Sequence, residues 1–375
     1  MKASERYEEL LHMLAPAGAG VHVVSTGLEE TRQLQQEIYG VSDASEVKQR
    51  WREDIMRIAS ARVIVLGVPS DAGAGFVRGA NQGPGAIRRF ALTEANHPYK
   101  DEAVIDAGDV RVVPHLLSEE MVSDEQRRAC QESLYGGASE LPVSPLGICR
   151  RALDHLRHLA PQAVPVVLGG DHSIGWPAFA SAFHIEEKVV GHRIGLLHFD
   201  AHTDLLPERL GVRYCFATWA YHANELLQRD GRLVQVGIRA SGQPRAHWEK
   251  TYNVRQYWPA ETDLRPATEV SSEIIERFRS LDCTALYISN DIDGTDGAFA
   301  SATGTPEAGG PPPQYVREIV QRVSAAFPTV GGDLVEVAPP LAGSVPGEPE
   351  TTLQTASDYF ADLISAGTNS QSEAQ

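Results

Sequence analysis

The stretch RIGLLHFDAHTDL, residues 193–205, passes from an apolar run into two carboxylates that flank a histidine. The run is short and rich in leucine and isoleucine, which is typical of a strand buried on both faces. Asp200, His202 and Asp204 follow one another at two-residue spacing, so in an extended segment their side chains point to the same side. Two acids and an imidazole that converge at the end of a strand predict a bound cation.

Five further apolar runs have the same character, and helical segments lie between them. With the first run, they cover residues 62–68, 164–169, 193–199, 232–238, 285–289 and 333–337. This alternation predicts an α/β protein, with one three-layer α/β/α domain and a central parallel sheet over residues 61–365. Ligands of such sheets bind beyond the carboxyl ends of the strands, so the residues that follow each run are candidates for a site.

Both ends of the chain differ from this pattern. Residues 1–60 predict a helical N-terminal extension, in which Ser42 or Asp43 would cap a helix whose apolar stripe consists of Val47, Trp51, Ile55 and Ile58. At the other end, residues 366–375 are small and polar and predict a disordered tail.

Composition narrows the class of partner and the compartment. Asp and Glu number 50 against 33 Lys and Arg, and the net charge of -17 disfavours nucleic acid and anionic membranes. The four cysteines are scattered, which favours a reducing compartment. No segment resembles a signal peptide or a membrane span, so we expect a cytoplasmic protein.

Three other runs also end in groups that bind metals. His172 follows the run 164–169, Asp291 and Asp293 follow the run 285–289, and Glu336 lies in the last run. If these strands are neighbours, the carboxylates would repel one another unless a counter-charge were present. Two divalent cations per subunit would supply that charge and lower the pKa of a shared water, and oxygen and imidazole ligands suit manganese, iron, cobalt, nickel or zinc.

The competing interpretation of each motif is local capping. A single pair of aspartates after a strand is more often a helix cap or a turn than a set of ligands. Three such motifs, each at the end of an apolar run, are much harder to ascribe to capping, so the metal interpretation is favoured.

Several segments together resemble a known family. GGDHS (169–173), FDAHTD (199–204) and SNDIDGTD (289–296) are similar to the three signature blocks of the ureohydrolase family of arginases and agmatinases. The resemblance extends to residues 67–89, 303–310 and 333–340, and covers roughly residues 60–360. It implies hydrolysis of a guanidinium compound to urea and an amine at a binuclear metal centre, in a subunit that assembles into a homotrimer or homohexamer.

The resemblance also implies roles for individual residues. The metal ligands would be His172, Asp200, His202, Asp204, Asp291 and Asp293, with the aspartates 200, 204 and 291 shared between the metals. Asp204 would in addition accept a hydrogen bond from the attacking hydroxide, and Glu336 would anchor the guanidinium group. A surface position for Glu336 is disfavoured by its apolar neighbours.

Two segments depart from the family pattern. Many family members carry a histidine in a Y-S-H-G-T segment that is assigned to proton transfer, and here Phe216 stands in its place. His222, six residues on, would be a substitute, unless it is an ordinary histidine on a helix surface. In the third block, prolines and a glycine are replaced by Gly297, Ser301 and Ala302, which predicts a different loop beside the metals.

These departures and the N-terminal arm are most similar to the guanidine hydrolase branch of the family, so we expect free guanidine to be converted to urea and ammonium. Phe216 and Trp219 would shorten the substrate pocket and face a small cation, unless they belong to the core or to a subunit contact. The resemblance associates nickel with guanidine hydrolases and manganese with most other members. A nickel enzyme would also have metal-delivery chaperones as candidate partners.

Two alternatives remain. The first is an agmatinase or a guanidino-acid hydrolase, for example one acting on 4-guanidinobutyrate, and a basic residue such as Arg209 or Arg213 in the pocket would favour it. The second is a homologue without activity that keeps its metals and serves as an oligomer partner.

Overall fold

The computed structural model describes residues 1–22, 27–137 and 139–370. In this part of the chain, nine strands form one sheet in the order β1-β3-β2-β4-β9-β8-β5-β6-β7. Neighbouring strands are parallel, except that β1 runs antiparallel to β3. The strands are β1 (Leu14–Ala15), β2 (Val63–Val68), β3 (Val104–Val110), β4 (Val164–Gly169), β5 (Ile194–Phe199), β6 (Leu233–Val236), β7 (Arg255–Tyr257), β8 (Ala285–Asp291) and β9 (Thr329–Val335).

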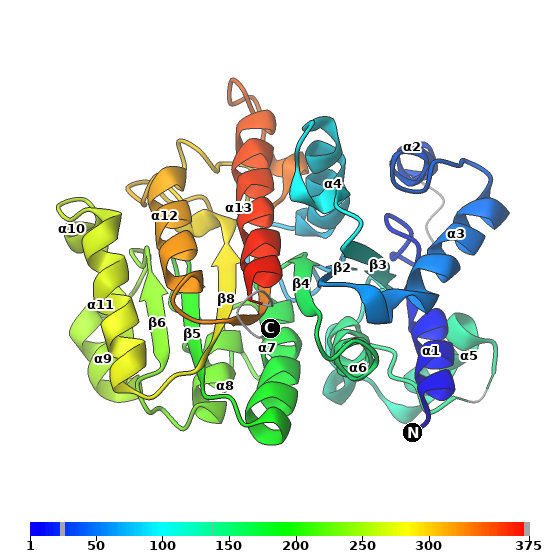
Figure 1. Ribbon diagram of the computed structural model, residues 1–375, viewed down its shortest axis with the longest axis horizontal. Coiled ribbons are helices and arrows are strands. Elements are labelled where there is room, and N and C mark those ends of the chain that lie inside the picture. The colour runs from blue at the N-terminus through cyan, green and yellow to red at the C-terminus, as the bar shows by residue number, and fades with distance from the viewer. Residues whose placement is uncertain (23–26, 138, 371–375) are drawn as a thin grey trace.

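Helices cover both faces of the sheet, which confirms the three-layer α/β prediction (Figure 1). One apolar core lies between one face and α1 (Ala3–Met13), α3 (Ala44–Met56), α6 (Pro145–Leu159), α7 (Gly175–Ala182) and α8 (Trp219–Leu226). The other core lies beneath α4 (Gly83–Thr93), α11 (Ala267–Ser280), α12 (Pro313–Ser324) and α13 (Glu350–Asn369). The remaining helices are α2 (Leu28–Tyr39), α5 (Asp124–Tyr135), α9 (Arg245–Tyr252) and α10 (Pro259–Thr262).

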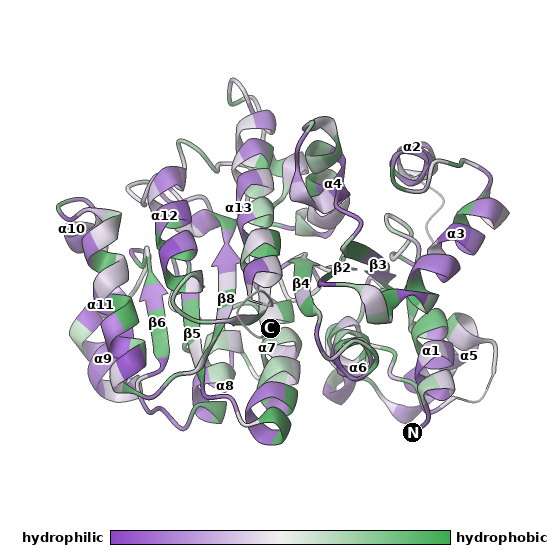
Figure 2. Ribbon diagram, in the orientation of Figure 1, coloured by the Kyte–Doolittle hydropathy of each residue, from purple (hydrophilic) through white to green (hydrophobic). Residues whose placement is uncertain are grey.

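The six predicted strands are all present, within a few residues of the predicted bounds. Strands β1, β3 and β7 were not predicted, because β1 has only two residues, β3 contains two aspartates and β7 reads RQY. Figure 2 shows that hydrophilic residues also occur inside the sheet, where β6 and β8 turn purple towards their carboxyl ends. This polar region lies on the side where the predicted ligands gather.

The N-terminal extension is helical, as predicted, and is also part of the sheet. Asp43 caps α3 by accepting hydrogen bonds from the backbone N–H groups of Ser45 (2.9 Å) and Glu46 (3.2 Å). Trp51 on the buried stripe of α3 is 1% exposed and donates from its indole N–H to the Ala107 carbonyl at 2.8 Å. Since β1 adds an edge strand beside β3, the extension belongs to the same core as the rest of the chain.

The disordered tail was predicted to begin at residue 366, which is before the last helix ends. Helix α13 continues to Asn369, and both Ala366 and Gly367 are buried in it. A Cβ atom on Gly367 would lie 3.0 Å from the Val63 side chain, so small residues are needed where this helix crosses the strands. The last residues of the predicted tail, 371–375, lie outside the described residues.

Within the described ranges, no helix combines the length and the apolar character that crossing a membrane requires.

Candidate metal centre

Four adjacent strands carry the predicted ligands at their carboxyl ends. In the sheet order β4-β9-β8-β5, the chain leaves β4 towards His172, β9 towards Glu336, β8 at Asp291 and β5 towards Asp200. Because the strands are parallel and buried, their carboxyl ends meet at one edge of the sheet. Side chains far apart in sequence therefore converge there.

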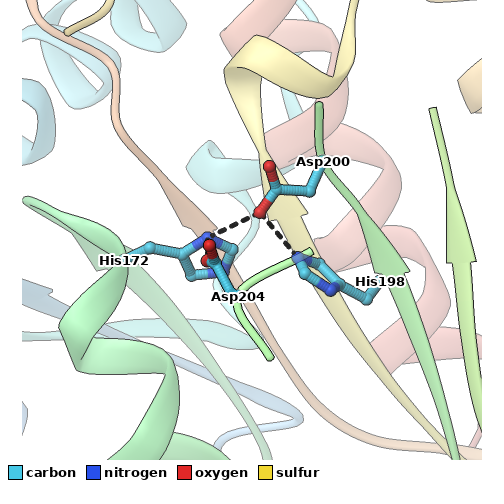
Figure 3. A group of neighbouring side chains, drawn as sticks. All are labelled: His172, His198, Asp200 and Asp204. Atoms are coloured by element: carbon cyan, nitrogen blue, oxygen red, sulfur yellow. Dashed lines mark hydrogen bonds and ion pairs between the residues drawn. The ribbon is translucent and has the colours of Figure 1, made fainter. Parts of the chain in front are cut away.

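The first group of candidate ligands surrounds the His172 ring. Its Nδ1 atom lies 3.0 Å from Asp291 Oδ2, 3.3 Å from Asp200 Oδ2 and 3.4 Å from Asp204 Oδ2. Figure 3 shows Asp200 between the rings of His172 and His198, with Asp204 beside His172. All four predicted members of this group are buried, so one small cation could contact several of them at once.

The second group consists of Asp200, His202 and Asp293. His202 Nδ1 lies 3.2 Å from Asp293 Oδ2 and 3.4 Å from Asp200 Oδ1. The two oxygens of Asp200 thus face different groups, as expected of a carboxylate shared by two ions. The His202 side chain is 27% exposed, against 1% for Asp200 and Asp293, so the centre is most open on the side of His202.

Hydrogen bonds from the surroundings hold the ligands. His172 Nε2 lies 3.0 Å from Ser289 Oγ, which in turn lies 2.7 Å from Asp333 Oδ1. If the Ser289 hydroxyl donates to Asp333, the Ser289 oxygen accepts the N–H at His172 Nε2. The lone pair on His172 Nδ1 is then directed at the carboxylates of the first group. Thr305 donates from its hydroxyl to Asp293 Oδ2 at 2.9 Å and fixes a ligand of the second group.

Trp219 lies behind the ligands and not at the predicted pocket mouth. It is fully buried, its ring stacks on His172 at 4.6 Å between centroids, and its indole N–H donates to Asp204 Oδ2 at 3.0 Å. A side chain without exposed surface has no access to a substrate. Trp219 therefore orients Asp204 and His172, and the prediction that it contacts substrate is corrected.

The protein groups of the centre need positive charge. Burial and then the neighbouring carboxylates raise the pKa of Asp204, Asp291 and Glu336 well above the ordinary range. Burial would also raise the pKa of Asp200, but hydrogen bonds from His172, His198 and His202 outweigh it and lower that pKa.

The two predicted imidazole ligands show the complementary effect. Burial opposes their charged forms, yet the Asp200 carboxylate raises the pKa of His172 to about 9. Asp200 and Asp293 together raise the pKa of His202 to about 12. These groups attract cations strongly, and a set of carboxylate and imidazole donors without thiolate fits divalent transition metals. The residues present thus fit a binuclear metal centre of the kind expected.

Two residues of the site have strained backbones. Asp204 has φ 51° and Glu336 has φ 62°, values in the left-handed region that residues other than glycine rarely adopt. Such conformations cost roughly 1–3 kcal/mol each and are found mainly at functional sites. Here they turn the two carboxylates towards the centre, Asp204 in the loop after β5 and Glu336 directly after β9.

Glu336 is held beside the first group. It is 7% exposed, and its Oε1 atom accepts a hydrogen bond from the backbone N–H of His172 at 2.8 Å. The Oε2 atom lies near Gly304, 3.9 Å from where a Cβ atom would be. A carboxylate with one oxygen fixed and the other oxygen beside a glycine could receive an N–H donor from a ligand.

Phe216 forms part of a pocket beside the centre. A Cβ atom on Gly75 would lie 2.1 Å from Phe216 Cζ, so the ring rests directly on the backbone of Gly75. The pocket has a volume of about 430 Å³, and its lining includes Phe216, Arg78 and Arg209. The guanidinium of Arg209 lies 5.0 Å from the centre of the Phe216 ring, whereas Arg213 lies over Tyr214 and is absent from the pocket lining.

His222 is a buried histidine of α8 and not a helix-surface one. It is 8% exposed, and its Nε2 atom lies 2.9 Å from the Arg213 carbonyl oxygen. Its ring packs against Tyr214, Trp176 and Tyr221, and burial lowers its pKa. Among the described residues, its contacts are with these groups and not with a candidate ligand, so its role in proton transfer stays a prediction.

The loop that departs from the family pattern is tied to α13. Ser301 donates from its hydroxyl to Glu348 at 2.9 Å, and the Ala302 backbone N–H donates to the Thr352 hydroxyl at 3.0 Å. Gly297 donates from its backbone N–H to the Glu307 carbonyl at 3.1 Å and closes the other end of the loop.

His198 is the residue of the site that the sequence interpretation missed. It is fully buried in β5, and its Nε2 atom lies 2.9 Å from Asp200 Oδ2. The signal was present, because His198, Asp200, His202 and Asp204 continue one two-residue spacing. The apolar residues around His198 concealed it.

Comparison with known proteins supports these features. Residues 61–364 match the model of the arginase family. Curated relatives include the mitochondrial agmatinase of Gallus gallus, which is 33% identical over 288 residues and 73% of each chain. The guanidinobutyrase of Pseudomonas aeruginosa is 30% identical over 73% of this chain and 78% of its own. The mitochondrial guanidino acid hydrolase of Homo sapiens is 30% identical over 73% of this chain and 71% of its own.

Solved structures show the same fold. The proclavaminate amidino hydrolase of Streptomyces clavuligerus superposes with a TM-score of 0.66 at 25% identity, over 84% of this chain and 94% of its own. The arginase of Bacillus subtilis superposes with a TM-score of 0.60 at 22% identity, over 80% of this chain and 98% of its own. With the matching family model, the relatives at 30% identity or more and the cluster of histidines and aspartates, the chain belongs to the arginase family and is a metal-dependent ureohydrolase.

Proposed function

We propose that the protein hydrolyses free guanidine to urea and ammonium at a centre of two divalent metal ions. The proposed ligands are His172, Asp200, His202, Asp204, Asp291 and Asp293. When bound, two such ions would lower the pKa of a water molecule and so supply a nucleophile near neutral pH. Nickel is the proposed metal for guanidine, and manganese is proposed if a longer substrate is preferred.

Residues of the protein would bind the substrate and transfer a proton from the attacking water. Glu336 Oε1 is occupied by the His172 backbone N–H, which leaves Oε2 to accept an N–H of the planar guanidinium. Trp219 holds Asp204 Oδ2 at 3.0 Å, which leaves Oδ1 to accept a proton from the attacking water. We propose that Asp204 then delivers this proton to the departing nitrogen.

The observation that carries the choice of guanidine is the enclosure of the site. Glu336 is 7% exposed and Asp204 is 6% exposed, and Phe216 rests on Gly75 at the adjacent pocket. A small planar cation needs less opening than a guanidinium with an alkyl chain.

A guanidino-acid hydrolase is the second candidate, and a different observation favours it. Among the described residues, the lining of the neighbouring pocket includes Arg78 and Arg209 and contains no Asp or Glu, although the chain has 50 acidic residues. Two guanidinium groups there would suit a carboxylate on the far end of a substrate such as 4-guanidinobutyrate. The names of the relatives in Pseudomonas aeruginosa and Homo sapiens point in the same direction.

The test is urea release from guanidine, agmatine, 4-guanidinobutyrate and arginine, with protein loaded separately with nickel and manganese. Under the first candidate, guanidine has the highest kcat/KM, and Arg209→Gln leaves that value within about two-fold. Under the second, 4-guanidinobutyrate is preferred, and Arg209→Gln lowers its kcat/KM by about ten-fold or more, as expected for a charged hydrogen bond. If the metal-replete protein released urea from none of the four compounds, this would instead favour the interpretation that it is an inactive homologue that serves as an oligomer partner.

We also propose that the protein is a cytoplasmic homotrimer or homohexamer. Light scattering of the full chain at micromolar concentration would give the subunit number. A monomer at that concentration would contradict the proposal.

A further inference from the structure

A row of buried polar side chains crosses five strands of the sheet just below the candidate ligands. Its members are direct partners in the strand register, and each is fully buried: Asp333 on β9, Ser289 on β8, His198 on β5, Gln235 on β6 and Gln256 on β7. We call this set the polar row. Burying so many polar groups in an apolar sheet is costly unless each group is hydrogen-bonded.

The hydrogen bonds at the β7 end of the polar row have only one consistent direction. The Trp258 indole, which can only donate, donates to Gln256 Oε1 at 3.0 Å. The oxygen of Gln256 is therefore at that end of its amide, and its Nε2 donates to Gln235 Oε1 at 2.8 Å. The amide of Gln235 must then direct its nitrogen towards β5 and the loop after it, where it donates to the Thr203 carbonyl at 2.8 Å.

This direction determines which nitrogen of His198 carries the proton. The second N–H of Gln235 points at His198 Nδ1 at 2.9 Å, so that nitrogen must accept. A neutral imidazole that accepts at Nδ1 carries its proton on Nε2. His198 Nε2–H then donates to Asp200 Oδ2, which lies 2.9 Å away.

Both nitrogens of His198 are thus already used. Its ligand atoms lie near those of His172, Asp200 and Asp204, close enough for a metal site by distance alone. Binding a metal through Nε2 would require the loss of that proton and of the Asp200 hydrogen bond. Binding through Nδ1 would require the loss of the Gln235 hydrogen bond.

We propose that His198 is a positioning residue and not a metal ligand, and that Gln235 and Gln256 hold it as the donor that orients the shared carboxylate of Asp200. Asp200 Oδ1 accepts the His202 backbone N–H at 2.6 Å, so the donor from His198 completes the orientation of both oxygens. The inference rests on the two-metal centre of the proposed function and is independent of its substrate.

The test compares metal binding by full-length variants, with Mn²⁺ as the probe. Competition with a chelator gives the affinity, and metal analysis at saturation gives the stoichiometry. Gln235→Met removes both donors of Gln235 without adding charge. His198→Leu removes the donor to Asp200, whereas His198→Gln keeps an N–H group at the distance of Nε2. Gln35→Met is the matched control, because Gln35 is also a buried glutamine that donates to a carbonyl, on α2.

We expect wild type, Gln35→Met and His198→Gln to bind two ions with similar affinity. Gln235→Met and His198→Leu should still bind two ions at saturation, but about 10- to 100-fold more weakly, as is usual for groups that orient metal ligands. The double variant that combines Gln235→Met with His198→Leu should bind Mn²⁺ no more weakly than His198→Leu alone, because both changes remove the same chain of hydrogen bonds.

Four results would overturn the inference. A stoichiometry of one ion in His198→Leu would make His198 a ligand. An unchanged affinity in Gln235→Met would mean that Gln235 does not hold His198 as the donor to Asp200. Weak binding by Gln35→Met as well would indicate a general loss of packing, which circular dichroism of each variant checks. Wild type that binds no metal would contradict the metal centre itself, which is distinguishable from a failure of the role proposed for His198 and Gln235 alone.

Discussion

Glu336 shows how much of this site depends on single residues. It is buried, it has a left-handed backbone, and its carboxylate is anchored by the backbone of His172. Burial and then the charges of Asp291 and Asp171 raise its pKa well above the ordinary value. Burial and these neighbouring negative charges disfavour the ionised form of Glu336, and a cation next to the carboxylate would stabilise it. A guanidinium substrate carries that positive charge.

Glu336→Gln should keep the fold and the metals but lose most of the activity. The amide oxygen of Gln can still accept the His172 N–H, whereas the charge that attracts the guanidinium is gone. Loss of a buried charged contact of about 3–4 kcal/mol corresponds to a fall in kcat/KM of roughly 10²- to 10³-fold. Urea release and metal content should be measured together.

The control for this variant is Glu276→Gln on α11, where the side chain is exposed. Its activity should equal that of wild type. If Glu336→Gln kept full activity with two metals bound, Glu336 would not anchor the substrate.

At the scale of elements, the N-terminal extension is an integral part of the fold. Helix α1 contacts α6, α3 contacts β3, and β1 lengthens the sheet by one strand. Leu10, Met13 and Trp51 lie in the same apolar core as residues of β2 and β3. Deletion of residues 1–58 would therefore remove part of the core of the subunit.

Trp51→Ala should destabilise the protein by about 3–5 kcal/mol, the usual cost of removing a buried aromatic side chain. Met56→Ala, on the same helix, should change stability by less than about 0.5 kcal/mol, because Met56 is 58% exposed. Urea denaturation followed by tryptophan fluorescence and circular dichroism gives both values. Equal effects of the two changes would mean that α3 does not contribute to the core.

The contact between α1 and α6 should weaken in acid. His155 is 3% exposed, its Nε2 atom lies 2.6 Å from Glu9 Oε2 and its Nδ1 atom accepts from Arg6 at 3.0 Å. Burial lowers the pKa of His155 and outweighs the attraction of Glu9, so the folded state binds this proton less tightly than the unfolded state. The unfolded state then holds more protons, and stability falls as the pH drops below about 6.5.

A second loss of stability, from protonation of Glu9, should follow at lower pH. Burial raises the pKa of Glu9, but hydrogen bonds and charge from Arg151 and His155 outweigh it and lower that pKa. The stabilisation from Glu9 is therefore present above its ordinary pKa of about 4.3 and is lost as the pH falls below it.

Thermal unfolding between pH 7.5 and 5 would test the contribution of His155. His155→Gln keeps a donor to Glu9 and cannot titrate, so its Tm should fall less steeply with acidification than that of wild type. His158→Gln, at an exposed position of the same helix, should follow wild type. If His155→Gln and wild type showed the same slope, the titration of His155 would not contribute to acid sensitivity.

The whole molecule combines a large negative charge with a concentration of carboxylates at one edge of the sheet. The net charge is -17, and Asp204, Asp291 and Glu336 all lie buried within the centre. Their raised pKa values mean that the empty protein must either protonate them or leave them in mutual repulsion. Bound cations should therefore stabilise the folded state as well as support catalysis.

Removal of metal should lower the Tm by several degrees, and manganese or nickel should restore it. A ligand that binds only the folded state at 100 times its Kd stabilises it by about 2.7 kcal/mol. Differential scanning fluorimetry with EDTA and with added metal would measure the shift. Asp200→Asn, which loses the charge of the carboxylate shared by both groups, should respond weakly to added metal, and a wild-type Tm that ignores both EDTA and metal would contradict the centre.

The sequence by itself determined the class of fold, most of the strands and the side chains that are candidates for the metal site. These features are local, because burial on both faces produces short apolar runs and the two-residue period of a strand directs Asp200, His202 and Asp204 to one side. The Asp43 cap and the stripe of α3 were predictable for the same reason. Strands β1, β3 and β7 were not, since they are short or polar and are stabilised by their neighbours in the sheet.

Only the tertiary structure decided which strands are neighbours and where each side chain points. The order β4-β9-β8-β5 brings His172, Glu336, Asp291 and Asp200 together. It also places Trp219 behind Asp204, Phe216 on Gly75 and His198 within the polar row, and each of these contacts joins different segments of the chain. Local patterns carry no information about such contacts, because they depend on how the helices and strands pack and on which hydrogen-bond partners remain for a buried polar group.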